Sequence, residues 1–220
     1  TSGLDYSYGP EKKENRLLTL YANYNKLVES IKSSFDVTAG YDYQYWKSTT
    51  PLYSEMNTLG EIQKTSKAKD ERHVLLSYYG RLNYSFDSRY MLTTTIRRDA
   101  TSRFAKNVRW GTFPSVALGW RVTEESFLKD NKVLSNLKLR ASYGVTGQQD
   151  GIGNYNYLPI YTQSQNGAEA SMGNGYIHTY RPSSYVPDLK WETTTSWNVG
   201  FDFGFLKDRI TGSFDYYTRQ

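Results

Sequence analysis

Two histidines are the residues best suited to metal binding or proton transfer in this chain of 220 residues. His73 and His178 are far apart in the sequence, and both fall in segments that we expect to be loops. Metal sites need several clustered donors, and the sequence has no cysteine that could add a thiolate. We therefore predict two solvated loop histidines, and we expect neither a metal ion nor a cofactor.

Two short patterns resemble parts of enzyme motifs. Gly151-Ile152-Gly153-Asn154 looks like a nucleotide-binding loop, but the third glycine is missing and the segment does not join a strand to a helix. Glu124 and Glu125 are adjacent, so the two carboxylates cannot flank one glycosidic bond. We expect them to begin a short helical turn, where acidic residues suit the positive end of the helix dipole. The sequence therefore predicts a protein that is not an enzyme.

A cluster of charged residues follows one of the predicted strands. Arg97, Arg98, Asp99 and Arg103 lie within seven positions of one another. They could contact an anionic ligand or lipopolysaccharide. We expect instead that they pair with carboxylates and order the base of a loop.

The segment 145–190 contains the best candidate binding residues. Asparagines and glutamines are interleaved there with tyrosines, and flat rings beside amide groups can stack on sugars and bind their hydroxyl groups. The same residue types suit protein interfaces, and the rings could also pack the segment against its neighbours. The candidate residues are Tyr155, Tyr157, Tyr161, Tyr176, Tyr180 and Tyr185, with amides at Asn154, Asn156, Gln163, Gln165 and Asn166.

The composition favours β-structure. Aromatic residues make up 16% of the chain, and 21 of them are tyrosines, whereas the mean hydropathy is only −0.70. No run of 18 apolar residues exists, which excludes a transmembrane helix. The net charge of +5 comes from interspersed charges, so we expect no nucleic-acid partner.

Alternation of apolar and polar residues predicts about eight strands. From Val74 to Phe86, the even positions are apolar or glycine, and polar residues fill most of the odd positions. Each strand is about as long as the ~9–11 residues that a tilted strand needs to cross a bilayer. The other predicted strands lie near 17–27, 35–45, 90–98, 114–122, 137–144, 191–203 and 210–217.

Short and long connections alternate along the predicted strands. Short links fall at 28–34, 87–89 and 206–209, with a somewhat longer one at 123–136 that has room for one helical turn. Long loops fall at about 47–73, 99–113 and 145–190. This is typical of outer-membrane barrels, which have short periplasmic turns and long extracellular loops. We therefore predict an all-β fold, an antiparallel transmembrane β-barrel, with residues 1–220 belonging to one barrel domain.

The order of the links predicts where the two ends of the segment lie. Both fall on the long-loop side, so we expect an internal part of a larger barrel. Two alternatives are a secreted soluble β-sandwich that binds carbohydrate and a complete eight-stranded barrel.

Several motifs resemble the SusC/RagA family of TonB-dependent outer-membrane transporters. They lie at 76–86, 97–104, 110–121, 137–147 and 191–204, in the order that the family has. Ala100-Thr101 replaces the usual Gly-Ser, and Gln148-Gln149 stands where an asparagine is common. Residues 1–73 resemble the family only in their strand-rich style.

The resemblance implies a 22-stranded barrel in the outer membrane of a Gram-negative bacterium of the Bacteroidetes type. Such proteins import oligosaccharides or peptides, and their partners are the TonB complex and a SusD-like surface lipoprotein. The plug domain and the TonB-interacting segment would lie upstream of this segment. The six tyrosines would then contact substrate or the lipoprotein.

Overall fold

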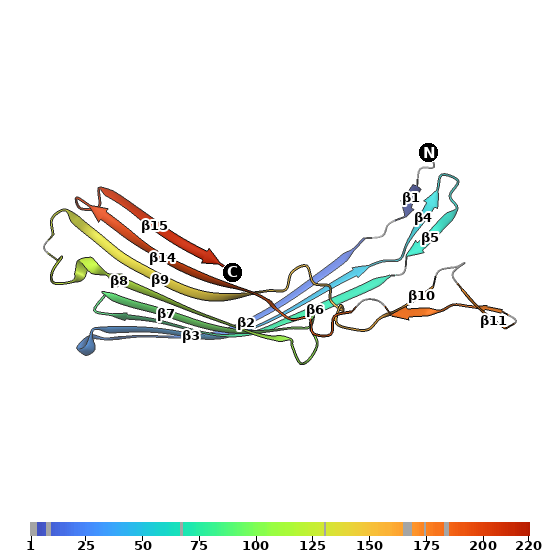
Figure 1. Ribbon diagram of the computed structural model, residues 1–220, viewed down its shortest axis with the longest axis horizontal. Coiled ribbons are helices and arrows are strands. Elements are labelled where there is room, and N and C mark those ends of the chain that lie inside the picture. The colour runs from blue at the N-terminus through green and yellow to red at the C-terminus, as the bar shows by residue number, and fades with distance from the viewer. Residues whose placement is uncertain are drawn as a thin grey trace.

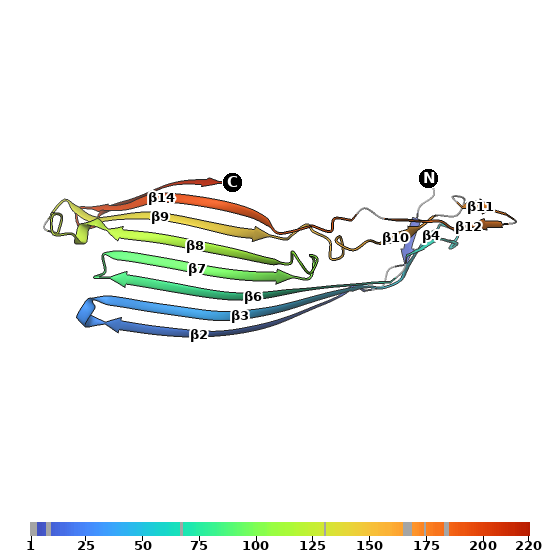
Figure 2. The ribbon, with the colours of Figure 1, turned by 60° about the horizontal axis from the view of Figure 1, so that its bottom comes forward.

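The computed structural model describes residues 4–7, 10–66, 68–129, 131–164, 169–173, 175–182 and 185–220. Its main feature is one antiparallel sheet of eight strands in the order β15-β14-β9-β8-β7-β6-β3-β2 (Figures 1 and 2). The sheet curves into an open wall, which confirms the predicted fold class and strand number. The strands are β2 (Lys12–Val28), β3 (Ser33–Thr50), β6 (Lys69–Phe86), β7 (Tyr90–Thr101), β8 (Trp110–Arg121), β9 (Leu134–Gln148), β14 (Glu192–Phe205) and β15 (Ile210–Arg219).

The strands extend further than the sequence predicted. β3 continues to Thr50 and β6 begins at Lys69, so both ends of the loop expected at 47–73 are strand. His73 therefore lies in β6, and the prediction that it is a loop residue was wrong. Alternation extends through these residues, but charged and polar side chains occupy both phases and obscure it.

Three smaller sheets extend from the long-loop end of the main sheet rather than covering either of its faces (Figure 2). This arrangement gives no support to a β-sandwich. The sequence did not predict these elements, which are three to five residues long. They are β1 (Leu4–Ser7) with β4 (Tyr53–Asn57) and β5 (Ile62–Ser66), β10 (Tyr161–Gln163) with β13 (Tyr180–Pro182), and β11 (Ala170–Met172) with β12 (Gly175–Ile177).

The opposite end has short connections. A 3₁₀ turn at Glu29–Ile31 joins β2 to β3, and another at Val122–Glu124 follows β8. The second confirms a helical turn in that link, but Glu124 closes the turn and Glu125 lies outside it, so neither residue begins it. Among the described residues, no helix is long and apolar enough to cross a membrane.

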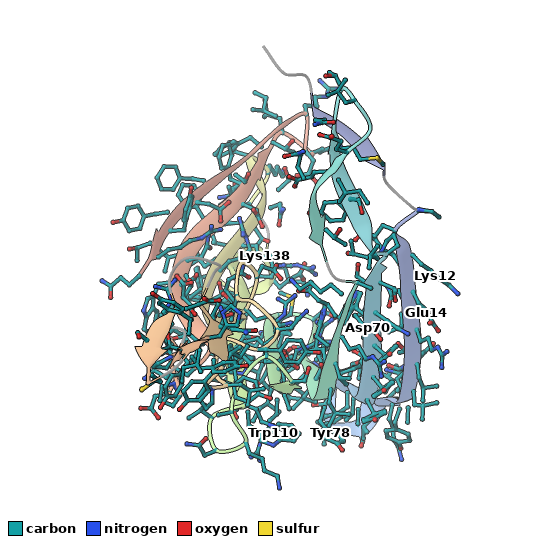
Figure 3. All side chains as sticks on the ribbon, turned by 90° about the vertical axis from the view of Figure 1, so that its right-hand side faces the viewer. Lys12, Glu14, Asp70, Tyr78, Trp110 and Lys138 are labelled. Atoms are coloured by element: carbon teal, nitrogen blue, oxygen red, sulfur yellow. The ribbon has the colours of Figure 1, made fainter. Side chains whose placement is uncertain are left out.

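The strand register places the apolar phases of all eight strands on one face. Leu82 on β6, for example, lies opposite Val37 on β3 and Thr94 on β7, and Thr94 lies opposite Val116 on β8. Because side chains alternate across a strand, the other phases form a second, polar face. We call these the apolar face and the polar face. Figure 3 shows Tyr78 and Trp110 on the convex apolar side and Lys138 toward the concave polar side.

Two rows of aromatic rings bound the apolar face. Near the short turns, Tyr90 stacks between Phe86 and Trp120, with ring centroids 6.2 and 6.4 Å apart. Toward the long loops, Tyr78 contacts Tyr41 and Trp110 at 5.2 and 6.1 Å. The side chains between the rows include Leu82, Leu92, Ile96, Val116 and Leu118. An aliphatic band between two aromatic rows is the pattern that a lipid-facing strand surface requires.

Candidate functional site

The polar face carries charged side chains that form hydrogen bonds with one another across neighbouring strands. Arg140 on β9 forms two hydrogen bonds with Asp202 on β14, at 3.0 and 2.9 Å, and a third with Asp215 on β15 at 3.0 Å. Gly200 lies between Arg140 and Asp215 in the register. A Cβ atom at position 200 would lie 2.5 Å from the Asp215 carboxylate, so the glycine leaves the space in which the two side chains meet.

Arg97 and Arg103 of the charge cluster predicted at the end of β7 lie beside carboxylates, as expected, whereas Arg98 contacts an aromatic ring. The Arg97 guanidinium binds the Asp99 carboxylate at 2.9 Å and the Ser77 hydroxyl at 3.0 Å. Arg98 lies over the Trp110 ring, 5.0 Å from its centroid. The Arg103 side chain donates to Asn154 Oδ1 and to the Gln149 carbonyl, both at 3.1 Å. These bonds connect the β7–β8 loop to the β9–β14 loop, which confirms that the cluster orders a loop base.

A small apolar core strengthens the same loop base. The Phe104 and Phe113 rings both pack edge-on against Trp191, with centroids 5.5 and 5.3 Å away. All three side chains are buried, and Phe104 has no exposed surface. The Trp191 indole also donates to the Arg109 carbonyl at 2.9 Å. The β7–β8 and β9–β14 loops are thus fixed to the wall by packing as well as by hydrogen bonds.

The six candidate tyrosines are spread along the β9–β14 loop rather than gathered in one place. Tyr161 lies in β10, Tyr180 in β13 and Tyr176 in β12, on an arm that projects beyond the wall (Figure 2). Tyr155, Tyr161, Tyr176, Tyr180 and Tyr185 are exposed, and Tyr157 is partly buried. Gln165 and Asn166 lie outside the described residues. The exposed rings remain candidates for contact with a ligand or a partner protein.

The two histidines lie on different elements. His178 lies in the loop after β12, as predicted, where Nε2 is 3.3 Å from the Glu169 carboxylate, so it is paired rather than simply solvated. His73 stacks on Trp46, with the ring planes 14° apart and the centroids 4.2 Å apart. Within the described ranges, no three metal-binding side chains gather.

A cavity of about 450 Å³ lies beside that stack. Its walls include Asn15, Trp46 and His73 from β2, β3 and β6, and Arg103 and Asn154 from the loops. Sequence reasoning did not assign Trp46 or His73 to a binding cavity. The alternation of side chains along each strand was the available signal. Continuing the alternation of 35–45 and 74–86 by one residue places Trp46 and His73 in the polar phase of their strands.

Glu125 binds aromatic residues at the short-turn end. Its carboxylate accepts hydrogen bonds from the Tyr90 hydroxyl at 2.6 Å and from the Trp120 indole at 3.0 Å. Both hydrogen bonds, with a further contribution from Arg89, hold the pKa of Glu125 below its usual value. The charged carboxylate therefore ties the turn to one aromatic row of the apolar face.

A curved antiparallel wall with one apolar and one polar face defines a segment of a membrane β-barrel. The family model for the TonB dependent receptor-like β-barrel matches residues 1–220, and the chain belongs to this family. TonB-dependent receptor SusC of Bacteroides thetaiotaomicron is 45% identical over 213 residues, and TonB-dependent receptor P39 of Formosa agariphila is 34% identical over 219 residues. Each match covers 90% of this chain but only 21% and 20% of the relatives, respectively.

Solved structures share the fold. The RagAB peptide transporter superposes with a TM-score of 0.79 at 24% identity, covering 95% of this chain and 24% of the other. The open-open state of the RagAB peptide importer gives a TM-score of 0.81, with 95% and 23% covered. This chain therefore corresponds in fold to about a quarter of the RagAB chain that it superposes on.

Proposed function

We propose that this segment belongs to an outer-membrane, TonB-dependent importer of oligosaccharides, with peptides as the alternative substrate class. The observation that carries the proposal is the two-faced wall of a chain that is 45% identical to a TonB-dependent receptor. The apolar face suits lipid, and the polar face suits a hydrated lumen. The segment supplies wall and loops, and it performs no enzymatic step.

The proposed partners follow from the same assignment. A SusD-like lipoprotein would cover the long-loop end, where the exposed tyrosines project from the wall. The TonB complex would act through parts of the protein outside residues 1–220. RagAB, whose fold this segment shares, is a peptide transporter, which is why peptides stay as the alternative.

The test is uptake by cells that carry the full-length gene. Deleting the gene should abolish uptake of a fluorescent oligosaccharide, and restoring it should rescue uptake only while TonB is functional. Labelled peptides of similar mass provide the comparison. Uptake that survives deletion of the gene or loss of TonB would refute the importer, whereas uptake of peptides alone would change the substrate class.

A further inference from the structure

We infer that the cavity beside Trp46 is a binding subsite for one ring of a neutral oligosaccharide. The inference rests on the proposed function and specifies where this segment contacts the substrate. The cavity lies on the polar face near the long-loop end, and it is distinct from the tyrosine-rich arm.

The register brings the polar residues of the cavity into one row. Trp46 on β3 lies opposite Asn15 on β2 and opposite His73 on β6. The imidazole covers one face of the indole at 4.2 Å. The other side of the indole faces β2, where Asn15 is a short amide, so that side of the ring borders the cavity. A flat indole beside an amide can hold a sugar ring by stacking and by hydrogen bonds to its hydroxyl groups.

Hydrogen-bonding groups converge on the same space. Arg103 is fixed by Asn154 Oδ1 and by the Gln149 carbonyl, and its side chain is only 16% exposed. Glu71 adds a carboxylate on the adjoining part of β6. Planar guanidinium, amide and carboxylate groups are the donors and acceptors that match vicinal hydroxyls. Because these groups are already positioned, binding would immobilise few further side chains.

The charges around the cavity are balanced, which favours a neutral ligand. Lys13 pairs with Glu11 at 3.3 Å, Glu71 pairs with Lys69, and Arg103 lies 3.9 Å from Asp150. Burial lowers the pKa of His73, and the positive charge of Arg103 lowers it further, which favours the neutral form of the imidazole. Each ionic group thus has a partner, and none is left for a phosphate, a sulfate or a peptide terminus.

The cavity is accessible to a substrate from the long-loop end of the wall. At this level the opposite face of the sheet carries Lys47, Asp70 and Arg72, which pair with one another at 3.5 and 2.6 Å. Charges of this kind do not face hydrocarbon, so the cavity lies beyond the apolar band. A substrate would meet it before descending along the polar face.

The test uses the full-length protein, purified with its lipoprotein partner, and calorimetric titration. The probes are neutral oligosaccharides of four to seven hexose units, sulfated oligosaccharides of the same length, and hexapeptides. Trp46→Ala should weaken neutral oligosaccharide binding about tenfold or more, and Trp46→Phe should retain most of the affinity. Trp197→Ala is the matched control, because Trp197 lies on the apolar face and is 58% exposed.

The possible results distinguish failure of the proposed subsite from failure of the proposed function. An unchanged dissociation constant for Trp46→Ala, in a protein that still imports oligosaccharide, would overturn the subsite but leave the importer intact. Equal weakening for oligosaccharides and hexapeptides would show a structural role and also overturn the subsite. If the unmodified protein binds hexapeptides and no oligosaccharide, both the subsite and the glycan assignment fail.

Discussion

At the scale of single residues, the position of a residue in the alternation of its strand determines whether its side chain lies on the apolar face or on the polar face. Leu82 lies between the two aromatic rows of the apolar face, whereas Thr93 on the neighbouring strand belongs to the polar face. The two side chains are therefore close in the sheet and opposite in environment. This contrast makes them a matched pair for testing the face assignment.

Leu82→Arg in the full-length protein should reduce the free energy of unfolding in lipid by about 2–4 kcal/mol, because the guanidinium would lie near the bilayer midplane. Leu76 lies beyond the Tyr78 row and Leu92 lies near the Tyr90 row, so arginine at either position should cost less. Denaturant titration in vesicles measures the effect, with Thr93→Arg as the control. Equal stability of the Leu82 and Thr93 variants would contradict the assignment.

The alternation of apolar and polar residues along each strand predicted the two faces of the wall, but it did not predict which residues line the cavity. Leu76, Leu82 and Tyr84 alternate regularly, and the structure places them together on the apolar face. Trp46 and His73 were not assigned to the cavity, because an aromatic ring in a polar phase breaks the usual pattern at the end of a strand. Their proximity also depends on the register of β3 with β6, which sequence alternation does not specify.

At the scale of elements, the core of Phe104, Phe113 and Trp191 holds the β7–β8 and β9–β14 loops to one end of the wall. Phe104 and Trp191 come from two loops that are separated in sequence, and Phe113 comes from strand β8. Sequence patterns predict where such loops lie, but they do not show which loop side chains meet. The motifs at 97–104, 110–121 and 191–204 contained these residues without indicating their contact.

Phe104→Ala should destabilise this loop base by about 3–5 kcal/mol, because it empties a fully buried site. We expect faster proteolysis of the β9–β14 loop, while the barrel strands stay resistant. Phe127→Ala is the control, since Phe127 is 69% exposed in the short-turn link. If both variants are digested at the rate of the unmodified protein, the core does not hold the loops.

The link between β8 and β9 should respond to acid. The hydrogen bonds from Tyr90 and Trp120 lower the pKa of Glu125, so their stabilising contribution is complete above the unfolded value near 4.5. It should be lost as the pH falls through the lower pKa of the folded state. Melting temperatures of the unmodified protein and of Glu125→Gln should therefore differ at pH 7 and converge below pH 4.5. A difference that does not change with pH would exclude this role.

At the scale of the whole molecule, the sheet is open. β2 and β15 are its edge strands, and they do not pair with each other in the described structure. Unpaired backbone groups cannot remain in hydrocarbon, because each costs several kcal/mol. In the complete barrel both edges must therefore pair with further strands.

Residues 1–220 expressed alone should not form a stable membrane-inserted monomer, because their open edges favour aggregation. Electrophoresis with and without heating measures this, since closed barrels migrate differently when folded. The full-length protein serves as the control and should show the shift. A heat-modifiable monomer from the isolated segment would show that eight strands close on their own.

The lengths of β3 and β6, 18 residues each, have a consequence for how far the wall extends beyond the lipid. At about 3.3 Å per residue such strands reach about 60 Å, and a tilt near 45° still leaves a height of about 40 Å. The apolar zone of such walls is only about 25 Å tall. The strands are therefore about 15 Å taller than the apolar zone, and their extra length at the long-loop end carries the paired charges of Lys47 and Asp70 out of the hydrocarbon.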